Sequence, residues 1–138
     1  MAVAHAVPSR AGETEKLTIN LGYVDLGRID LLVQEGFYSN RSDFIRTAIR
    51  NQLNEHKNDV GKSLSRGHFE LGLCTYSRAD LEAAKAAGER LNIRVLGLAS
   101  IAPDVPAALA RATIESITVL GALHASKDVK AALADRIH

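Results

Sequence analysis

The C-terminal half of the chain contains an internal repeat of 24 residues, and this repeat restricts the fold more than any other feature of the sequence. Three consecutive segments align without gaps: 69–92, 93–116 and 117–138. Asp80, Asp104 and Asp128 fall at one shared position, and the last two segments also share VLG and DVxAALA. A unit repeated at a fixed spacing predicts an array of similar structural units.

Each unit reads as a short apolar strand, a turn, an aspartate at a helix N-terminus and an alanine-rich helix. A strand followed by a helix three times over predicts a small α/β region with parallel strands and right-handed crossovers. Gly72, Gly97 and Gly121 recur near the strand centres without a phosphate-binding loop around them. We therefore expect them to allow close packing between strand and helix.

The N-terminal part of the chain has a different pattern. From Glu15 to Leu21 apolar and polar residues alternate strictly, which is the period of a half-buried strand. Lys16, Thr18 and Asn20 form the polar face of this predicted strand.

Helical spacing begins after Gly22 and predicts two helices. Gly36 is placed to end the first helix, and Asn40 is placed to cap the second, with Asp43 completing a near variant of the capping box. The apolar stripe of the second helix is expected to be buried and comprises Phe44, Ile45, Ala48, Ile49 and Leu53.

These patterns predict four segments. Residues 1–14 form a flexible arm, 15–54 a strand-helix-helix domain, 55–68 a polar linker with Gly61 and Gly67 as helix breakers, and 69–138 a repeat domain for oligomerisation or sensing.

One strand and two helices are too small to bury a core alone, so the first domain needs a partner. If two copies pair this strand antiparallel, Lys16, Thr18 and Asn20 project in duplicate from a ribbon that fits the major groove. Lysine suits guanine acceptors, an amide such as Asn20 suits adenine, and threonine can contact either kind of base edge. At the start of the second helix, free N–H groups and the helix dipole favour a phosphate oxygen.

The letters KLTINL, followed by a helix and then EGFYSNRSDFIRTAIRNQL, resemble the ribbon-helix-helix family of the Arc/MetJ/CopG type. The resemblance covers residues 15–53, and its most specific part is the turn and helix start from Gly36 to Arg46. It implies a dimeric β-α-α fold with an antiparallel ribbon. It also implies base contacts by Lys16, Thr18 and Asn20, and phosphate contacts by the turn residues Asn40, Arg41 and Ser42. Members are typically repressors, antitoxins or plasmid-partition proteins.

Two further arginines are candidates for DNA contacts. Arg10 in the arm could reach a flanking groove, and Arg46 is expected on the outer face of the second helix. The formal net charge of +1 does not by itself indicate a nucleic-acid partner, so any basic surface must be local.

Other functional classes find little support in the sequence. His68, Cys74 and His124 lack the spacing of a metal site, so we expect no metal and no cofactor, and no set of residues suggests catalysis. A single cysteine excludes an intrachain disulfide, and no apolar run is long enough to span a bilayer. We expect a cytoplasmic protein without a membrane partner.

The sequence therefore predicts a transcriptional regulator, most simply a repressor, that binds double-stranded DNA in a sequence-specific manner. It is expected to be a homodimer through residues 15–53 and a higher homo-oligomer through 69–138. One alternative is an antitoxin or partition protein whose C-terminal region binds a protein partner. Another is an assembly scaffold that does not bind DNA.

Overall fold

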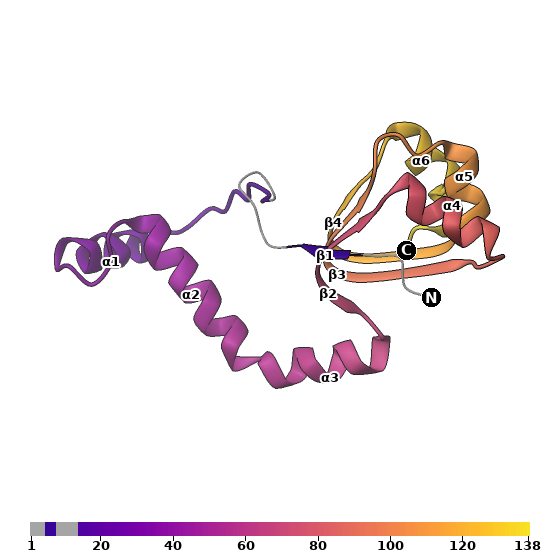
Figure 1. Cartoon of the computed structure of the whole chain (residues 1–138). Coiled ribbons are helices and arrows are strands. Elements are labelled where there is room, and N and C mark those ends of the chain that lie inside the picture. Colours follow the sequence, from indigo (N-terminus) through magenta and orange to yellow (C-terminus); the bar gives the residue numbers. More distant parts are fainter. Residues whose placement is uncertain (1–4, 8–13) are drawn as a thin grey trace. The chain divides into compact units, whose positions relative to one another are not determined.

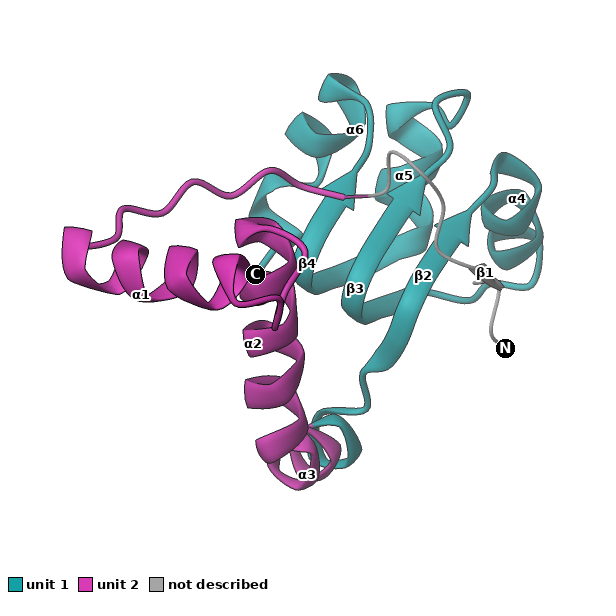
Figure 2. Cartoon of the chain, turned by 90° about the vertical axis from the view of Figure 1, so that its left-hand side faces the viewer, with its two compact units in different colours: residues 1–13, 64–138 teal, residues 14–63 magenta. Residues whose placement is uncertain are grey.

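The computed structural model describes residues 5–7 and 14–138 (Figure 1). The chain divides into two compact units (Figure 2). Unit 2 comprises residues 14–63, and unit 1 contains strand β1 and residues 64–138.

Helix α1 (Tyr23–Gln34) begins after Gly22 and ends at a glycine, as the sequence predicts. Gly36 has a φ of +84°, and its N–H donates to the carbonyl of Val33. The N–H of Phe37 donates to the carbonyl of Leu32. This pair of bonds is the Schellman ending, in which glycine takes the left-handed conformation at low cost.

Helix α2 (Arg41–Glu55) has the predicted N-cap. The Asn40 side chain accepts a hydrogen bond of 2.8 Å from the backbone N–H of Asp43. The Asp43 carboxylate accepts in turn from the N–H of Ser39 at 2.9 Å, one residue before the cap. The start of α2 is therefore fixed by two reciprocal side-chain bonds.

The predicted N-terminal strand is not present. Residues 15–21 are extended but belong to no strand, and the first described strand is β1 (His5–Val7), in the segment predicted to be a flexible arm. A β-strand exists only where a neighbouring strand supplies backbone hydrogen bonds, and no described strand lies beside these residues. The β-α-α prediction with an antiparallel ribbon is therefore wrong for this structure.

The apolar stripe of α2 is not buried within the single chain. No residue of α2 is buried, and Ile49 and Leu53 are 51% and 61% exposed. Within residues 14–63 the one buried side chain is Ile29 of α1. Unit 2 therefore has almost no core of its own.

The segment predicted to be a polar linker is mostly helical. Helix α3 (Lys57–Gly67) follows α2 after a single residue, His56. Gly61 lies within this helix and does not break it.

Unit 1 is a two-layer α/β structure. Its remaining elements are β2 (Glu70–Tyr76), α4 (Arg78–Ala86), β3 (Leu91–Ile101), α5 (Ala107–Thr113), β4 (Ile114–His124), α6 (Lys127–Ala132) and a 3-10 turn, η1 (Ala134–Arg136). The sheet order is β1-β2-β3-β4. Strands β2, β3 and β4 pair in parallel, which confirms the three parallel strands predicted from the repeat, and β1 pairs antiparallel with β2.

The three glycines of the repeat lie in one row across the sheet. Gly72 pairs with Gly97, and Gly97 pairs with Gly121. Their φ angles are +124°, +138° and +126°, a region that only glycine enters readily. The spacing between the first two is one residue longer than 24, so the first repeat is out of step with the others.

Helices α4, α5 and α6 cover one face of this sheet (Figure 1). The core between the layers is built mainly of aliphatic side chains, among them Leu81, Val95, Ala99, Ile117 and Leu133, each fully buried. The repeated aspartates differ in their positions. Asp80 and Asp128 lie in the first turn of α4 and α6, whereas Asp104 precedes α5 by three residues.

Candidate nucleic-acid interface

The polar residues of segment 15–21 are open to solvent. Lys16, Thr18 and Asn20 are all exposed, and they lie just before the start of α1. The alternate residues are exposed as well, with Leu17 at 81% and Ile19 at 61%. In the single chain both sides of the segment are therefore accessible to a partner.

The three residues predicted to contact phosphate, at the start of α2, differ in whether their side chains are already bonded within the chain. The side-chain oxygen of Asn40 is engaged in the helix cap. Arg41 is the first residue of α2 and is paired with an acid from α1. Ser42 is exposed in the first turn, where backbone N–H groups lack partners within the helix.

The ion pair of Arg41 was not predicted from the sequence. Its Nε donates to Oδ1 of Asp30 and its Nη2 donates to Oδ2, both at 2.8 Å. These two bonds hold the pKa of the Asp30 carboxyl below its usual range and raise the pKa of Arg41. Asp30 lies near the end of α1, 11 residues earlier in the chain, so no local sequence motif joins the two residues.

The other two arginines are placed differently. Arg46 is exposed on α2, in agreement with an outward position. Arg10 lies outside the described residues, so its predicted role stays a prediction.

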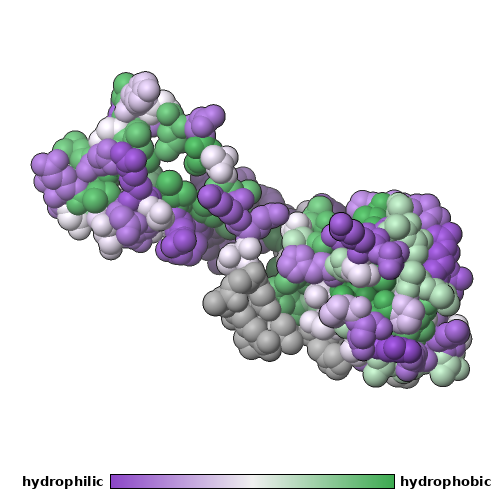
Figure 3. Space-filling model, turned by 90° about the horizontal axis from the view of Figure 1, so that it is seen from above, coloured by the Kyte–Doolittle hydropathy of each residue, from purple (hydrophilic) through white to green (hydrophobic). Residues whose placement is uncertain are grey.

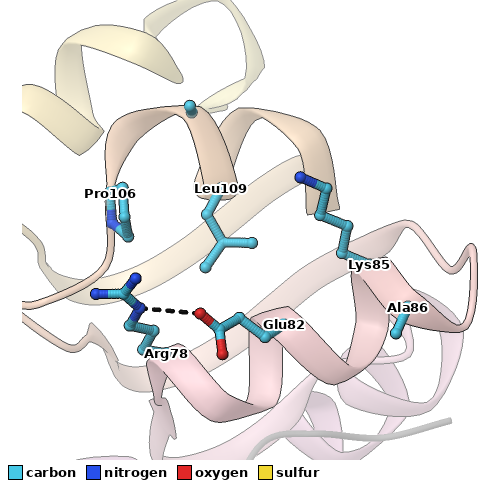
Figure 4. A pocket seen from close by; sticks show the side chains of 7 residues that line it. Arg78, Glu82, Lys85, Ala86, Pro106 and Leu109 are labelled. Carbon is cyan, nitrogen blue, oxygen red and sulfur yellow. Dashed lines mark hydrogen bonds and ion pairs between the residues drawn. The ribbon is translucent and has the colours of Figure 1, made fainter.

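Unit 1 contains an open groove between α4 and α5 (Figure 4). Its volume is about 570 Å³, and Pro106 and Leu109 form much of its apolar lining. Arg78 and Glu82 form an ion pair of 3.0 Å at its side, and Lys85 projects from the next turn of α4. The sequence prediction of a sensing role named no residues, so this groove was missed.

The residues considered for metal binding do not form a site. Within the described part of the chain, no three His, Cys, Asp or Glu side chains are grouped as metal ligands would be. Cys74 is buried, and its thiol donates to Oε2 of Glu70 at 3.3 Å. Burial, together with this carboxylate, raises the pKa of the Cys74 thiol to about 11. Across residues 5–7 and 14–138, no helix is both long and apolar enough to cross a membrane.

A comparison with protein-family models matches residues 12–130 to the ribbon-helix-helix transcriptional regulator family. The match covers most of the chain, including every described residue predicted to contact DNA. The chain belongs to the ribbon-helix-helix transcriptional regulator family. Comparisons with curated proteins and with solved structures found no match.

Segment 15–21 and the start of α2 both lie within the region that matches the ribbon-helix-helix family. The family consists of DNA-binding transcriptional regulators, and it implies both DNA binding and dimerisation. The match extends through most of unit 1 and ends within α6, so it is not limited to the N-terminal unit.

Proposed function

We propose that the protein is a sequence-specific repressor that binds double-stranded DNA as a homodimer in the cytoplasm. The observation that carries this proposal is the exposure of Lys16, Thr18 and Asn20 on one open segment, within the region that matches the regulator family. The segment carries donors, an acceptor and a methyl group, which are the chemical groups that distinguish bases in the major groove.

The base contacts are assigned to segment 15–21 and the phosphate contacts to the start of α2. Lys16 and Asn20 suit guanine and adenine edges, and Thr18 can contact a thymine methyl group. Ser42 and the N–H groups beside it suit a phosphate oxygen, with Arg41 adding charge. Asn40 contributes by holding these groups in place, because its side-chain oxygen is used in the cap.

The dimer is assigned to residues 15–53. A unit of 50 residues with one buried side chain has too little core to be stable alone. Hydrophobic side chains gather on the surface of this unit, which is on the left in Figure 3. They include Leu17, Ile19, Leu31, Ile49 and Leu53, each more than half exposed. A second copy would bury this apolar surface, and the family implies such a dimer.

Residues 69–138 are assigned to a higher homo-oligomer. The sheet face opposite the helices carries two rows of apolar residues in register: Leu71, Leu96 and Leu120, then Leu73, Leu98 and Ala122. Leu71 is 67% exposed and Leu120 is 55% exposed. A contiguous apolar face that is open to solvent is typical of a surface that associates with a partner. The proposed dimer carries two copies of this apolar face, and pairing of each copy with the same face on another dimer would join dimers into a larger assembly.

An antitoxin or partition protein is the main alternative, with unit 1 binding another protein. The same rows of leucine favour it, since they could pack against a different apolar surface. A scaffold without DNA affinity is the alternative from another class.

Salt dependence of duplex binding tests the proposal. Genomic fragments are first selected with the full chain, and the affinity for a selected duplex is then measured over a range of salt concentrations. We expect the logarithm of affinity to fall linearly with the logarithm of salt, with a slope of about 0.9 for each phosphate that the protein neutralises. A protein that selects no fragments and shows no duplex affinity at low salt would be a scaffold.

A further inference from the structure

The ion pair between Asp30 and Arg41 fixes the rotation of an arginine at the start of α2. Both carboxylate oxygens of Asp30 accept a hydrogen bond of 2.8 Å, one from Nε and one from Nη2 of Arg41. A planar fork held at two points can neither rotate nor slide without losing a bond. The guanidinium therefore has one orientation relative to α1 and α2.

This contact uses one edge of the guanidinium and leaves another edge available. The group has five N–H donors, and the side that bears Nε faces Asp30. The Nη1 atom makes no hydrogen bond to the described residues. The N–H groups that do not bond to Asp30 are therefore the two on Nη1 and the second one on Nη2. Two of them point in parallel and match the spacing of two phosphate oxygens.

Stability alone gives a weak reason for this ion pair. The side chains of Arg41 and Asp30 are 56% and 49% exposed, and exposed ion pairs contribute little to folding. Asp30 carries a negative charge at neutral pH, as an aspartate ordinarily does, and the hydrogen bonds from Arg41 lower the pKa of its carboxyl further. A negative charge beside a phosphate-binding position repels the DNA. A favourable effect of the same carboxylate on DNA binding must therefore offset this repulsion.

We propose that Asp30 is a positioning residue that orients Arg41 so that the free edge of its guanidinium binds a phosphate of double-stranded DNA. This inference rests on the proposed function. Asp30 does not touch the DNA in this arrangement. It acts through Arg41. Because the ion pair already restricts the arginine side chain before DNA binds, less conformational entropy is lost on binding.

The opposing effects of charge and orientation make the test decisive. Asp30→Asn removes the negative charge, which by itself strengthens DNA binding, and it also breaks the two-point ion pair. Asp25→Asn is the matched control, because Asp25 is an exposed acid of α1 that lies 3.8 Å from Arg28 and is not paired with Arg41. Affinity for a genomic duplex selected with the unchanged chain is measured against salt for both variants, for Arg41→Gln and for the double variant Asp30→Asn/Arg41→Gln.

We expect Asp30→Asn to weaken binding by a few-fold to about tenfold, the loss expected when a long side chain must be ordered on binding, and Asp25→Asn to leave binding equal or tighter. The salt slope should become shallower by about 0.9 if Arg41 no longer neutralises its phosphate. In the Arg41→Gln background, Asp30→Asn should cause no further weakening. Far-UV circular dichroism checks that each variant is folded.

Two results would overturn the inference while leaving the proposed function intact. One is unchanged or tighter binding by a folded Asp30→Asn variant. The other is equal weakening by Asp30→Asn with and without Arg41. If Asp30→Asn fails to fold, Arg41→Lys keeps the charge without the fork, and binding as tight as that of the unchanged chain would overturn it too. Absence of duplex binding by the unchanged chain would instead refute the proposed function.

Discussion

At the scale of single residues, chemistry and backbone geometry decide what each position contributes. Asn20 has an exposed amide in an open segment, so its proposed role is recognition and not packing. Gly97 has the opposite character, because its place in the sheet leaves no room for a side chain.

Asn20→Ala is predicted to reduce discrimination between a selected duplex and random DNA. The loss should be roughly 1–3 kcal/mol for each bidentate interaction with adenine, because an alanine cannot donate and accept at a base edge. Competition binding with the two duplexes measures the difference. Equal loss of affinity for both DNAs would contradict base recognition by this residue.

Gly97→Ala is predicted to destabilise unit 1 more than Gly72→Ala does. Both positions have φ values that strain an alanine, at a cost of about 1–3 kcal/mol. A Cβ at Gly97 would also overlap the carbonyl oxygen of Gly72, whereas a Cβ at Gly72 has nothing within 4 Å. Urea unfolding of the full chain measures the two losses. Equal losses would show that the overlap is relieved by a small backbone shift.

At the scale of elements, apolar surfaces that the single chain leaves open predict two separate association steps. Segment 15–21 and α2 expose one such surface, and the sheet face with Leu71 and Leu120 exposes the other. The two surfaces lie on different units, so substitutions should affect them independently.

Ile19→Asp and Leu120→Asp are predicted to stop assembly at different stages. Ile19→Asp places a charge in the proposed dimer surface and should remove duplex affinity together with association through residues 15–53, leaving only association through the sheet face of unit 1. Leu120→Asp should leave the dimer and its duplex affinity intact and remove only the larger species. Analytical ultracentrifugation of the full chain distinguishes these states. A Leu120→Asp variant that forms the same oligomer as the unchanged chain would exclude this sheet face as the interface.

At the scale of the whole molecule, stability is concentrated in unit 1, which contains nearly all the buried side chains of the described residues. Its core includes the thiol of Cys74 and the ring of Tyr76, and burial raises the pKa of both groups. A group that holds its proton more tightly when folded favours the folded state at any pH below its unfolded pKa. This contribution is lost as the pH rises toward the folded value.

Stability is therefore predicted to fall as the pH rises from about 8.5, the usual pKa of a free thiol, toward the pKa of about 11 that Cys74 has in the folded chain. The loss from this group should be about 3 kcal/mol, and Tyr76 should add to it above about pH 10. Urea unfolding at several pH values measures the decline. Cys74→Ala should be nearly flat between about pH 8.5 and 10, and an equally steep decline in that variant would assign the effect to other groups.

Local patterns in the sequence were sufficient for several elements. The helix ending at Gly36 and the cap at Asn40 depend on bonds between residues a few positions apart, so the residues themselves predict them. The three parallel strands follow from the repeat, because each unit carries its own strand and helix pattern. The family could be recognised from the turn and helix start, which are also local.

Strand pairing, burial and the ion pair between the two helices depend on long-range interactions, which the local patterns do not predict. The absence of a strand at 15–21 depends on which backbone lies beside it, and β1 pairs with β2 across more than 60 residues of chain. The ion pair of Asp30 with Arg41 exists because the turn brings two helices together. The stripe of α2 is not buried within the single chain for the same reason, since periodicity marks an apolar face without identifying what covers it. Local bonding is encoded in neighbouring residues, whereas burial and pairing depend on where distant segments meet.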